Sequence, residues 1–209
     1  MPAPSDTLYR SPDADTLEFF DRLAELYAQM DERYEEVAAA YGFDCRGCAD
    51  NCCQTRFYHH THIETAYFLH GFFQLDAEER AAAVERARAV IDAQEREVPG
   101  ADRLMCPVNR EGWCRVYPYR PMICRLHGLA HELNVPGRPR QYGPGCAEFD
   151  RVSAGMAYVP FDRTPFYVRM AGLEKEFKAH AGKDSRLRLS IAEMLVEAES
   201  QLTKKDNSP

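Results

Sequence analysis

Residues 45–53 have the sequence CRGCADNCC, which places four of the chain's eight cysteines within nine positions. Cys45 and Cys48 form a C-x2-C pair, and its short turn can direct both sulfurs at one metal ion about 2.3 Å away. Cys52 and Cys53 are adjacent, and neighbouring side chains are expected to diverge. We therefore expect Cys45 and Cys48 to share a site. We expect Cys52 and Cys53 to serve different sites, or one of them to stay free of metal.

The cellular compartment decides between metal ligands and disulfides. The opening MPAPSDTLYRSPDADTLEFF lacks a basic segment followed by an apolar one, and no later run approaches eighteen apolar residues. We therefore expect a cytoplasmic protein without a membrane segment, whose cysteines bind metal. A disulfide framework is the alternative. With 45% hydrophobic residues over 209 positions, the chain does not need one to form a core.

The overall charge limits the class of partner. The chain carries a net charge of −7 and has a pI near 5.5. A surface built for nucleic-acid phosphates or anionic lipids is usually basic, so neither partner is expected. A metal ion or cluster, a small molecule or a protein fits this charge better.

Helical patterns flank the cysteines. Apolar residues recur at steps of three and four over 14–42, which predicts a long N-terminal helix that is capped near Asp15 and ends at Gly42. A charged helix is expected over 76–98, and further helices over 163–204. We predict a mainly α fold, with these helices packed around a small irregular α+β core that is rich in cysteine and binds metal.

The predicted core covers residues 43–150 of a single domain that spans residues 1–209. It should contain a short strand over 54–60, a helix capped by Thr61 with Glu64, and a hairpin that turns between Asn109 and Gly112. The other four cysteines also lie in it: Cys106, Cys114, Cys124 and Cys146. Eight thiols divide into two four-ligand sites. One site with spare thiols, or a redox-active pair, is the alternative.

Basic residues are concentrated near these later cysteines. Between residues 103 and 140 the sequence contains seven arginines and only two acidic residues. The arginines are Arg103, Arg110, Arg115, Arg120, Arg125, Arg138 and Arg140, and the acidic residues are Glu111 and Glu132. A four-thiolate centre has a net charge of about −2, which nearby arginines would offset. A solvated basic loop is the alternative. Pro121 suits the first turn of a helix, whose positive end would favour the Cys124 thiolate.

Histidines and aromatic residues offer further candidates. One of His59, His60 and His62 could replace a cysteine as a ligand, although surface histidines are common. His127 could donate to a sulfur, or be an ordinary histidine at the edge of the core. A second set could shield a metal centre or simply fill the core: Trp113, Tyr117 and Tyr119. No pattern of a catalytic triad, phosphate loop or carboxylate pair is present.

The ordered cysteines resemble a known family. The pattern C-x2-C-x3-C-C at 45–53, followed by CP, GWC, YPYRPMICR and GC around the later cysteines, is similar to the YkgJ-type cysteine-cluster family. That family is described as a zinc- or iron-chelating domain, and the resemblance covers residues 43–148. A related cluster occurs in flagellin lysine methylases, where the resemblance implies an iron–sulfur centre and methyl transfer. No glycine-rich cofactor motif accompanies it in this sequence.

These observations predict a protein that binds iron, as an iron–sulfur cluster, or zinc through its eight cysteines, in one or two sites. The cluster is preferred because zinc sites usually show two close ligand pairs, and only one C-x2-C pair is present. An iron–sulfur enzyme of redox or methyl-transfer type is the alternative. A third possibility is an interaction module with structural metals, for which the sequence identifies no protein partner.

Overall fold

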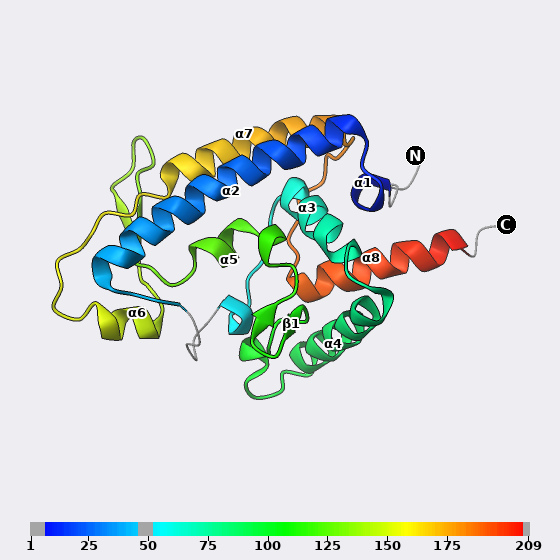
Figure 1. Ribbon diagram of the computed structural model, residues 1–209, viewed down its shortest axis with the longest axis horizontal. Coiled ribbons are helices and arrows are strands. Elements are labelled where there is room, and N and C mark those ends of the chain that lie inside the picture. The colour runs from blue at the N-terminus through cyan, green and yellow to red at the C-terminus, as the bar shows by residue number, and fades with distance from the viewer. Residues whose placement is uncertain (1–6, 46–51, 207–209) are drawn as a thin grey trace.

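The computed structural model describes residues 7–45 and 52–206, and Figure 1 shows their arrangement. The α-helices are α1 (Thr7–Arg10), α2 (Ala14–Tyr41), α3 (His62–Phe73), α4 (Ala77–Glu95), α5 (Met122–Leu126), α6 (Ala147–Val152), α7 (Thr164–His180) and α8 (Ile191–Asp206). Three 3-10 turns are η1 (Cys52–Gln54), η2 (Ala101–Arg103) and η3 (Tyr117–Tyr119). The strands are β1 (Asn109–Arg110), β2 (Trp113–Cys114), β3 (His131–Leu133) and β4 (Gln141–Gly143). The predicted mainly helical fold is confirmed.

The long N-terminal helix is α2. Its cap is Asp13 rather than Asp15, because the Asp13 carboxylate accepts a hydrogen bond of 2.8 Å from the Thr16 amide. It ends at Gly42 as predicted, where a φ of 62° gives the left-handed conformation that suits glycine. In Figure 1, α2 runs alongside α7 for most of its length. This pair forms one side of the molecule.

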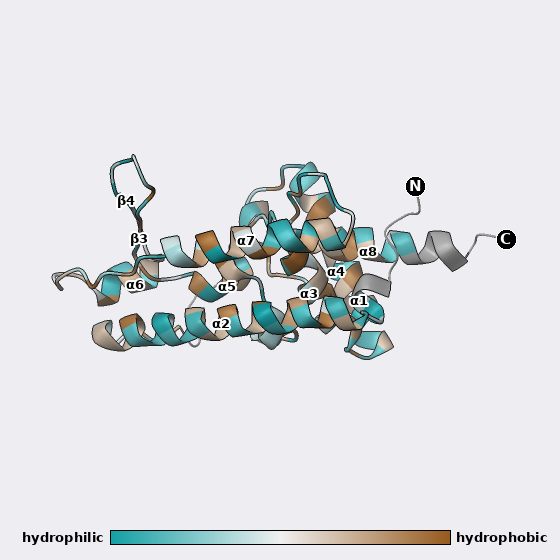
Figure 2. Ribbon diagram, turned by 90° about the horizontal axis from the view of Figure 1, so that it is seen from above, coloured by the Kyte–Doolittle hydropathy of each residue, from teal (hydrophilic) through white to brown (hydrophobic). Residues whose placement is uncertain are grey.

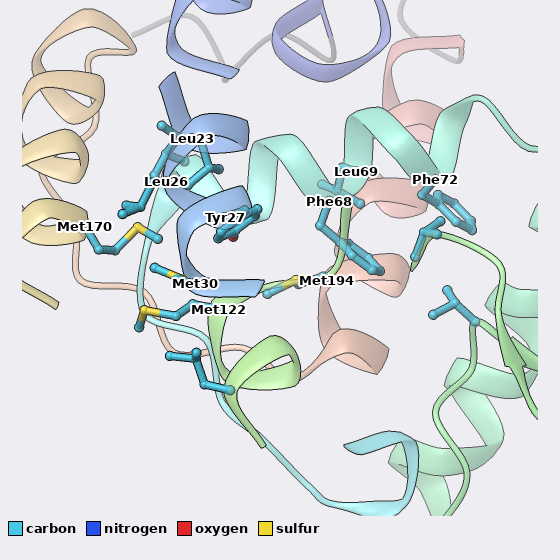
Figure 3. Close-up of a cluster of buried hydrophobic side chains, with 14 of the residues drawn as sticks. Leu23, Leu26, Tyr27, Met30, Phe68, Leu69, Phe72, Met122, Met170 and Met194 are labelled. Carbon is cyan, nitrogen blue, oxygen red and sulfur yellow. The ribbon is translucent and has the colours of Figure 1, made fainter. Parts of the chain in front are cut away.

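The hydrophobic core lies where α2 meets α3, α5 and α7, and it extends across α3 to α8. Figure 3 shows its side chains converging from these five helices: Leu23, Leu26, Tyr27, Met30, Phe68, Leu69, Phe72, Met122, Met170 and Met194. All of them are buried. Burying a side chain of this size contributes about 1.5 to 3 kcal/mol. The core can therefore support the fold without cysteine staples.

Two elements before α3 differ from expectation. The strand predicted over 54–60 is reduced to a single bridge, in which the backbones of His59 and Leu189 exchange hydrogen bonds of 2.8 and 3.1 Å. Thr61 does precede the helix, but its hydroxyl donates to the Glu64 carboxylate at 2.5 Å instead of capping a backbone amide. The bridge nevertheless fixes the segment after the cysteines against the start of α8.

The strands form two separate hairpins. β1 and β2 pair antiparallel with Asn109 opposite Cys114, which confirms the predicted turn between Asn109 and Gly112. β3 and β4 form the second pair, which stands away from the helices in Figure 2. The same figure shows hydrophilic and hydrophobic residues mixed along the helices. No helix within the described residues is long and apolar enough to cross a membrane.

Two helical glycines provide a matched test of this packing. A Cβ at Gly71 in α3 would lie 2.2 Å from the Tyr119 ring, whereas one at Gly172 in α7 would meet no atom within 4 Å. We expect Gly71→Ala to lower the free energy of unfolding by about 1 to 3 kcal/mol, because Tyr119 must move. Gly172→Ala should raise it by about 0.5 to 1 kcal/mol. Urea denaturation measures both, and equal effects of the two changes would contradict this account.

Candidate metal centre

Six cysteines line one cavity: Cys45, and five others that come from four further segments. Cys52 and Cys53 come from η1, and the others come from the loop before β1, from β2 and from α5: Cys106, Cys114 and Cys124. The Cys106 amide donates a hydrogen bond of 2.6 Å to the Cys53 carbonyl oxygen, which joins the first segment to the second. The β1–β2 pairing then adds Cys114. The structure thus brings together most of the sequence-predicted ligands.

Three of these sulfurs accept hydrogen bonds, two from backbone amides of their own segment and one from a side chain of β1. The Val108 amide donates to Cys106, and the Val116 amide donates to Cys114. Each donor lies two residues after its cysteine. The Asn109 side chain hydrogen-bonds Cys53 and lowers its pKa. Such N–H···S contacts orient thiolates and stabilise their charge when they bind a metal.

Three of the thiols nevertheless favour their protonated form in the absence of a cation. Burial raises the pKa of Cys114 to about 11, and it also raises the pKa values of Cys106 and Cys124. For Cys124, the neighbouring sulfurs of Cys106, Cys114 and Cys53 add repulsion. The expectation that the helix end favours a Cys124 thiolate is therefore wrong. A helix of five residues has a small dipole, and burial outweighs it.

The adjacent thiols do not diverge as expected. A hydrogen bond between them raises the pKa of Cys52 and lowers that of Cys53 to about 6. Because η1 turns tightly, both sulfurs can face the same side of the chain. Of the two thiols, Cys53 is therefore the one that ionises more readily.

A second group of cysteines lies around Tyr34 of α2. Burial raises the pKa of Tyr34, and the nearby sulfurs of Cys45 and Cys146 raise it further. Cys146 also begins α6, where its sulfur accepts from the Phe149 amide at 3.4 Å. Cys48 lies outside the described residues, so its expected pairing with Cys45 stays a prediction. Cys45 also borders the cavity that the other five thiols line.

Most of the seven arginines are engaged elsewhere. Arg110 and Arg115 approach the buried Glu79 carboxylate of α4 at 4.0 and 3.0 Å. Arg140 pairs with Glu132 at 3.4 Å on the β3–β4 hairpin. Their positive charges therefore serve carboxylates rather than thiolates. The expectation that arginines offset the thiolate charge does not hold for these three, because the chain folds them onto Glu79 and Glu132.

Arg120 does act on the thiols. Its charge lowers the pKa values of Cys52, Cys53, Cys114 and Cys124, opposing the effect of burial. The side chain lies over the Tyr117 ring at 3.9 Å and is 17% exposed. Arg125 also lowers the pKa of Cys114, so these two arginines of the set act on the thiols.

Arg125 has a structural role, together with Glu64. The buried Arg125 guanidinium donates to Asp31 and to the carbonyl oxygens of Pro118 and Arg120. Glu64 in α3 accepts from the Tyr27 hydroxyl at 2.9 Å and from the Met122 amide at 2.7 Å. These contacts hold α5, and hence Cys124, against α2 and α3. Sequence reasoning assigned Glu64 only to a cap.

The histidines divide into two classes. His60 and His62 bond the carbonyl oxygens of Leu187 and Ser185, both at 3.1 Å, so they hold the chain before α8. His59 is 3% exposed and borders the cavity. The His127 ring packs edge-on against Phe57, with 5.3 Å between ring centroids.

The aromatic residues near Cys114 also have different surroundings. Trp113 is 69% exposed, and Tyr117 is half exposed. Tyr119 instead packs against Gly71, and its hydroxyl donates to Gln74 at 3.0 Å. Trp113 and Tyr117 therefore border the cavity without closing it, and Tyr119 fills space between η3 and α3.

The thiols share the cavity but do not form a preformed metal site. Over residues 7–45 and 52–206, no three side chains of Cys, His, Asp or Glu lie close enough together to hold an ion. Comparison of the chain with protein-family models, curated proteins and solved structures gives no match. Any metal function is therefore inferred from the chemistry of the donors.

Proposed function

We propose that this protein binds a metal centre through the four thiols Cys53, Cys106, Cys114 and Cys124. The observation that supports the proposal is that these thiols line one cavity and interact electrostatically with one another. Four sulfur ligands suit either a tetrahedral zinc ion or an iron–sulfur cluster. Because no three ligands are close enough now, binding requires the sulfurs to move together.

The surroundings of the sulfurs fit a cation. Raised pKa values mean that burial disfavours several thiolates in one place unless positive charge is supplied. Arg120 supplies some of this charge, and the Val108 and Val116 amides point donors at two of the sulfurs. Structural disulfides need none of these features. A metal would supply the remaining charge.

We favour an iron–sulfur cluster over zinc for two reasons: the sequence has only one C-x2-C pair, and the cysteine pattern resembles the YkgJ-type family. Cys52 would then donate to Cys53 beside the centre. Cys45 and Cys146 would belong, with Cys48, to a second site around Tyr34. A catalytic iron–sulfur protein stays the second candidate, because a cavity of about 830 Å³ adjoins the thiols. A purely structural centre would not need such a cavity.

Metal analysis tests the proposal directly. Protein purified without oxygen should contain iron and acid-labile sulfide and absorb broadly near 400 nm, as thiolate-bound clusters do. Colourless protein with stoichiometric zinc would reject the cluster and keep the metal site. Protein that acquires neither iron nor zinc after anaerobic reconstitution would reject both.

Proton release provides a sharper test. At pH 7.5 Cys53 should be a thiolate, whereas the raised pKa values keep Cys106, Cys114 and Cys124 protonated. Zinc binding to the metal-free chain should therefore release about three protons, and affinity should rise steeply with pH. Calorimetry in buffers of different ionisation enthalpy measures the number. Release of fewer than one proton would place the zinc on carboxylates or histidines instead.

A further inference from the structure

The cavity is larger than the proposed metal centre requires. Its volume is about 830 Å³, within the range of about 300 to 1,000 Å³ that accommodates a drug-sized ligand. The thiols occupy only part of its lining. Residues of α3, α4 and α8 complete it, and none of those residues is a cysteine: Phe68, Val90, Gln94, Ile191 and Ala192. Space beside the thiols is therefore available to an organic molecule.

Three polar atoms in this lining are buried without a hydrogen-bond partner among the described residues. They are His59 Nε2, Arg56 Nε and Arg120 Nε. His59 is only 3% exposed. Burial lowers the pKa of its imidazole, so the ring is neutral near pH 7. A buried polar group that lacks a partner is uncommon in folded proteins, because desolvation is costly. These atoms are covered from solvent in this structure, so a ligand in the cavity reaches them only after a small movement of their side chains.

The two arginines indicate the charge of that ligand. Arg56 contacts the Asp102 carboxylate at 3.7 Å, and Arg120 contacts Asp31 at 3.5 Å, both through terminal nitrogens. These ion pairs leave each Nε–H available. Asp102 and Glu111 also border the cavity, but their side chains are 88% and 85% exposed, so water screens their charges. Arg56 and Arg120 are the cationic groups of this lining, and Cys53, whose pKa is lowered, lies on its thiol side.

The rest of the wall is mainly apolar. It consists largely of aromatic and aliphatic side chains: Phe57, Phe68, Val90, Leu104, Met105, Val108, Trp113, Ile191 and Ala192. We propose that the cavity binds a small organic carboxylate with an apolar, preferably aromatic, body. Arg56 and Arg120 hold the carboxylate, and His59 adds a hydrogen bond. This site goes beyond the proposed metal centre, with which it shares the thiol side of the cavity and Arg120.

A matched pair of probes tests this inference. 2-Naphthoate and its neutral counterpart 2-naphthamide are titrated by calorimetry into the full chain, both metal-loaded and metal-free. We expect one naphthoate per chain and binding of the amide about tenfold weaker, because charge-assisted hydrogen bonds to arginine are lost. Arg56→Gln should weaken naphthoate about tenfold and change naphthamide less than about twofold. Ala192→Leu should weaken both probes, because it fills the cavity.

The controls separate this site from general electrostatics and from the metal. Arg138→Gln removes the same charge from an exposed position on the β3–β4 hairpin and should leave both affinities unchanged. Equal binding of acid and amide, an equal loss with Arg138→Gln, or binding of neither probe to a chain that still unfolds cooperatively would overturn the inference. Naphthoate binding by a chain that takes up no metal would overturn only the metal centre. Metal uptake without naphthoate binding would overturn only the carboxylate site.

Discussion

Replacement of Cys124 by serine is expected to empty the proposed metal centre. Cys124 interacts electrostatically with Cys106, Cys114 and Cys53, and those three thiols also interact with one another. A serine hydroxyl stays protonated near neutral pH and is a poor ligand for zinc or iron. We expect metal affinity to fall by about 100-fold or more. Metal content per chain after gel filtration measures the loss.

Cys146→Ser is the matched control for this change. Cys146 belongs to the group around Tyr34, and serine is a favourable residue at the start of a helix such as α6. This variant should keep the metal of the four-thiol centre, as judged by the absorption of that centre. If the two variants lose the same metal to the same extent, the division into two groups is wrong. If Cys124→Ser keeps full metal content, the proposed ligand set is wrong.

Arg125→Met should be among the most destabilising changes at a charged residue, even in the metal-free chain. The guanidinium is 6% exposed, lies over the Tyr27 ring at 4.2 Å, and bonds Asp31 and two carbonyl oxygens. Removal leaves these acceptors without their donor, and loss of one member of a buried pair typically costs about 3 to 5 kcal/mol. Asp31 is 32% exposed, so we expect about 3 kcal/mol. Denaturant unfolding measures it.

Measuring the stability of the metal-free chain distinguishes two roles for Arg125, namely anchoring α5 and offsetting the charge of metal-bound thiolates. If Arg125 mainly offset thiolate charge, its loss would matter only when metal is bound. Arg138→Met should change stability by less than about 0.5 kcal/mol, because its side chain is exposed. A loss below about 1 kcal/mol for Arg125→Met in the metal-free chain would show that it does not anchor α5.

The local parts of the fold were predictable from local patterns. Apolar periodicity over 14–42 placed α2 nearly to the residue, and Gly42 marked its end. The turn from Asn109 to Gly112 was also correct, because turn residues encode their own geometry. The strand over 54–60 failed. Its β-prone residues had no neighbouring strand to pair with, and only His59 found a partner, from a segment about 130 residues later in the chain.

The arrangement of the candidate site could be predicted only in part. Cysteine spacing identified the residues, yet which thiols meet depends on contacts such as that between Cys53 and Cys106. The arginine excess suggested one basic shell, but Glu79, Asp31 and Glu132 come from distant elements and attract most of it. The cavity itself depends on side chains of α4 and α8 that have no chemical signature in the sequence. Long-range packing, rather than residue type, determines these features.

The ribosome makes the thiols of the shared cavity before it makes the α8 residues that complete the cavity wall. Cys124 is made about 70 residues after Cys53, which corresponds to roughly 4 to 14 s on a ribosome adding about 5 to 20 residues per second. The α8 residues that complete the wall, Ile191 and Ala192, follow almost 70 residues later still. A metal carrier could therefore reach the gathered thiols while that wall is still missing. An organic carboxylate would find its full binding surface only after α8 has docked, whereas the four proposed metal ligands are all made before α8.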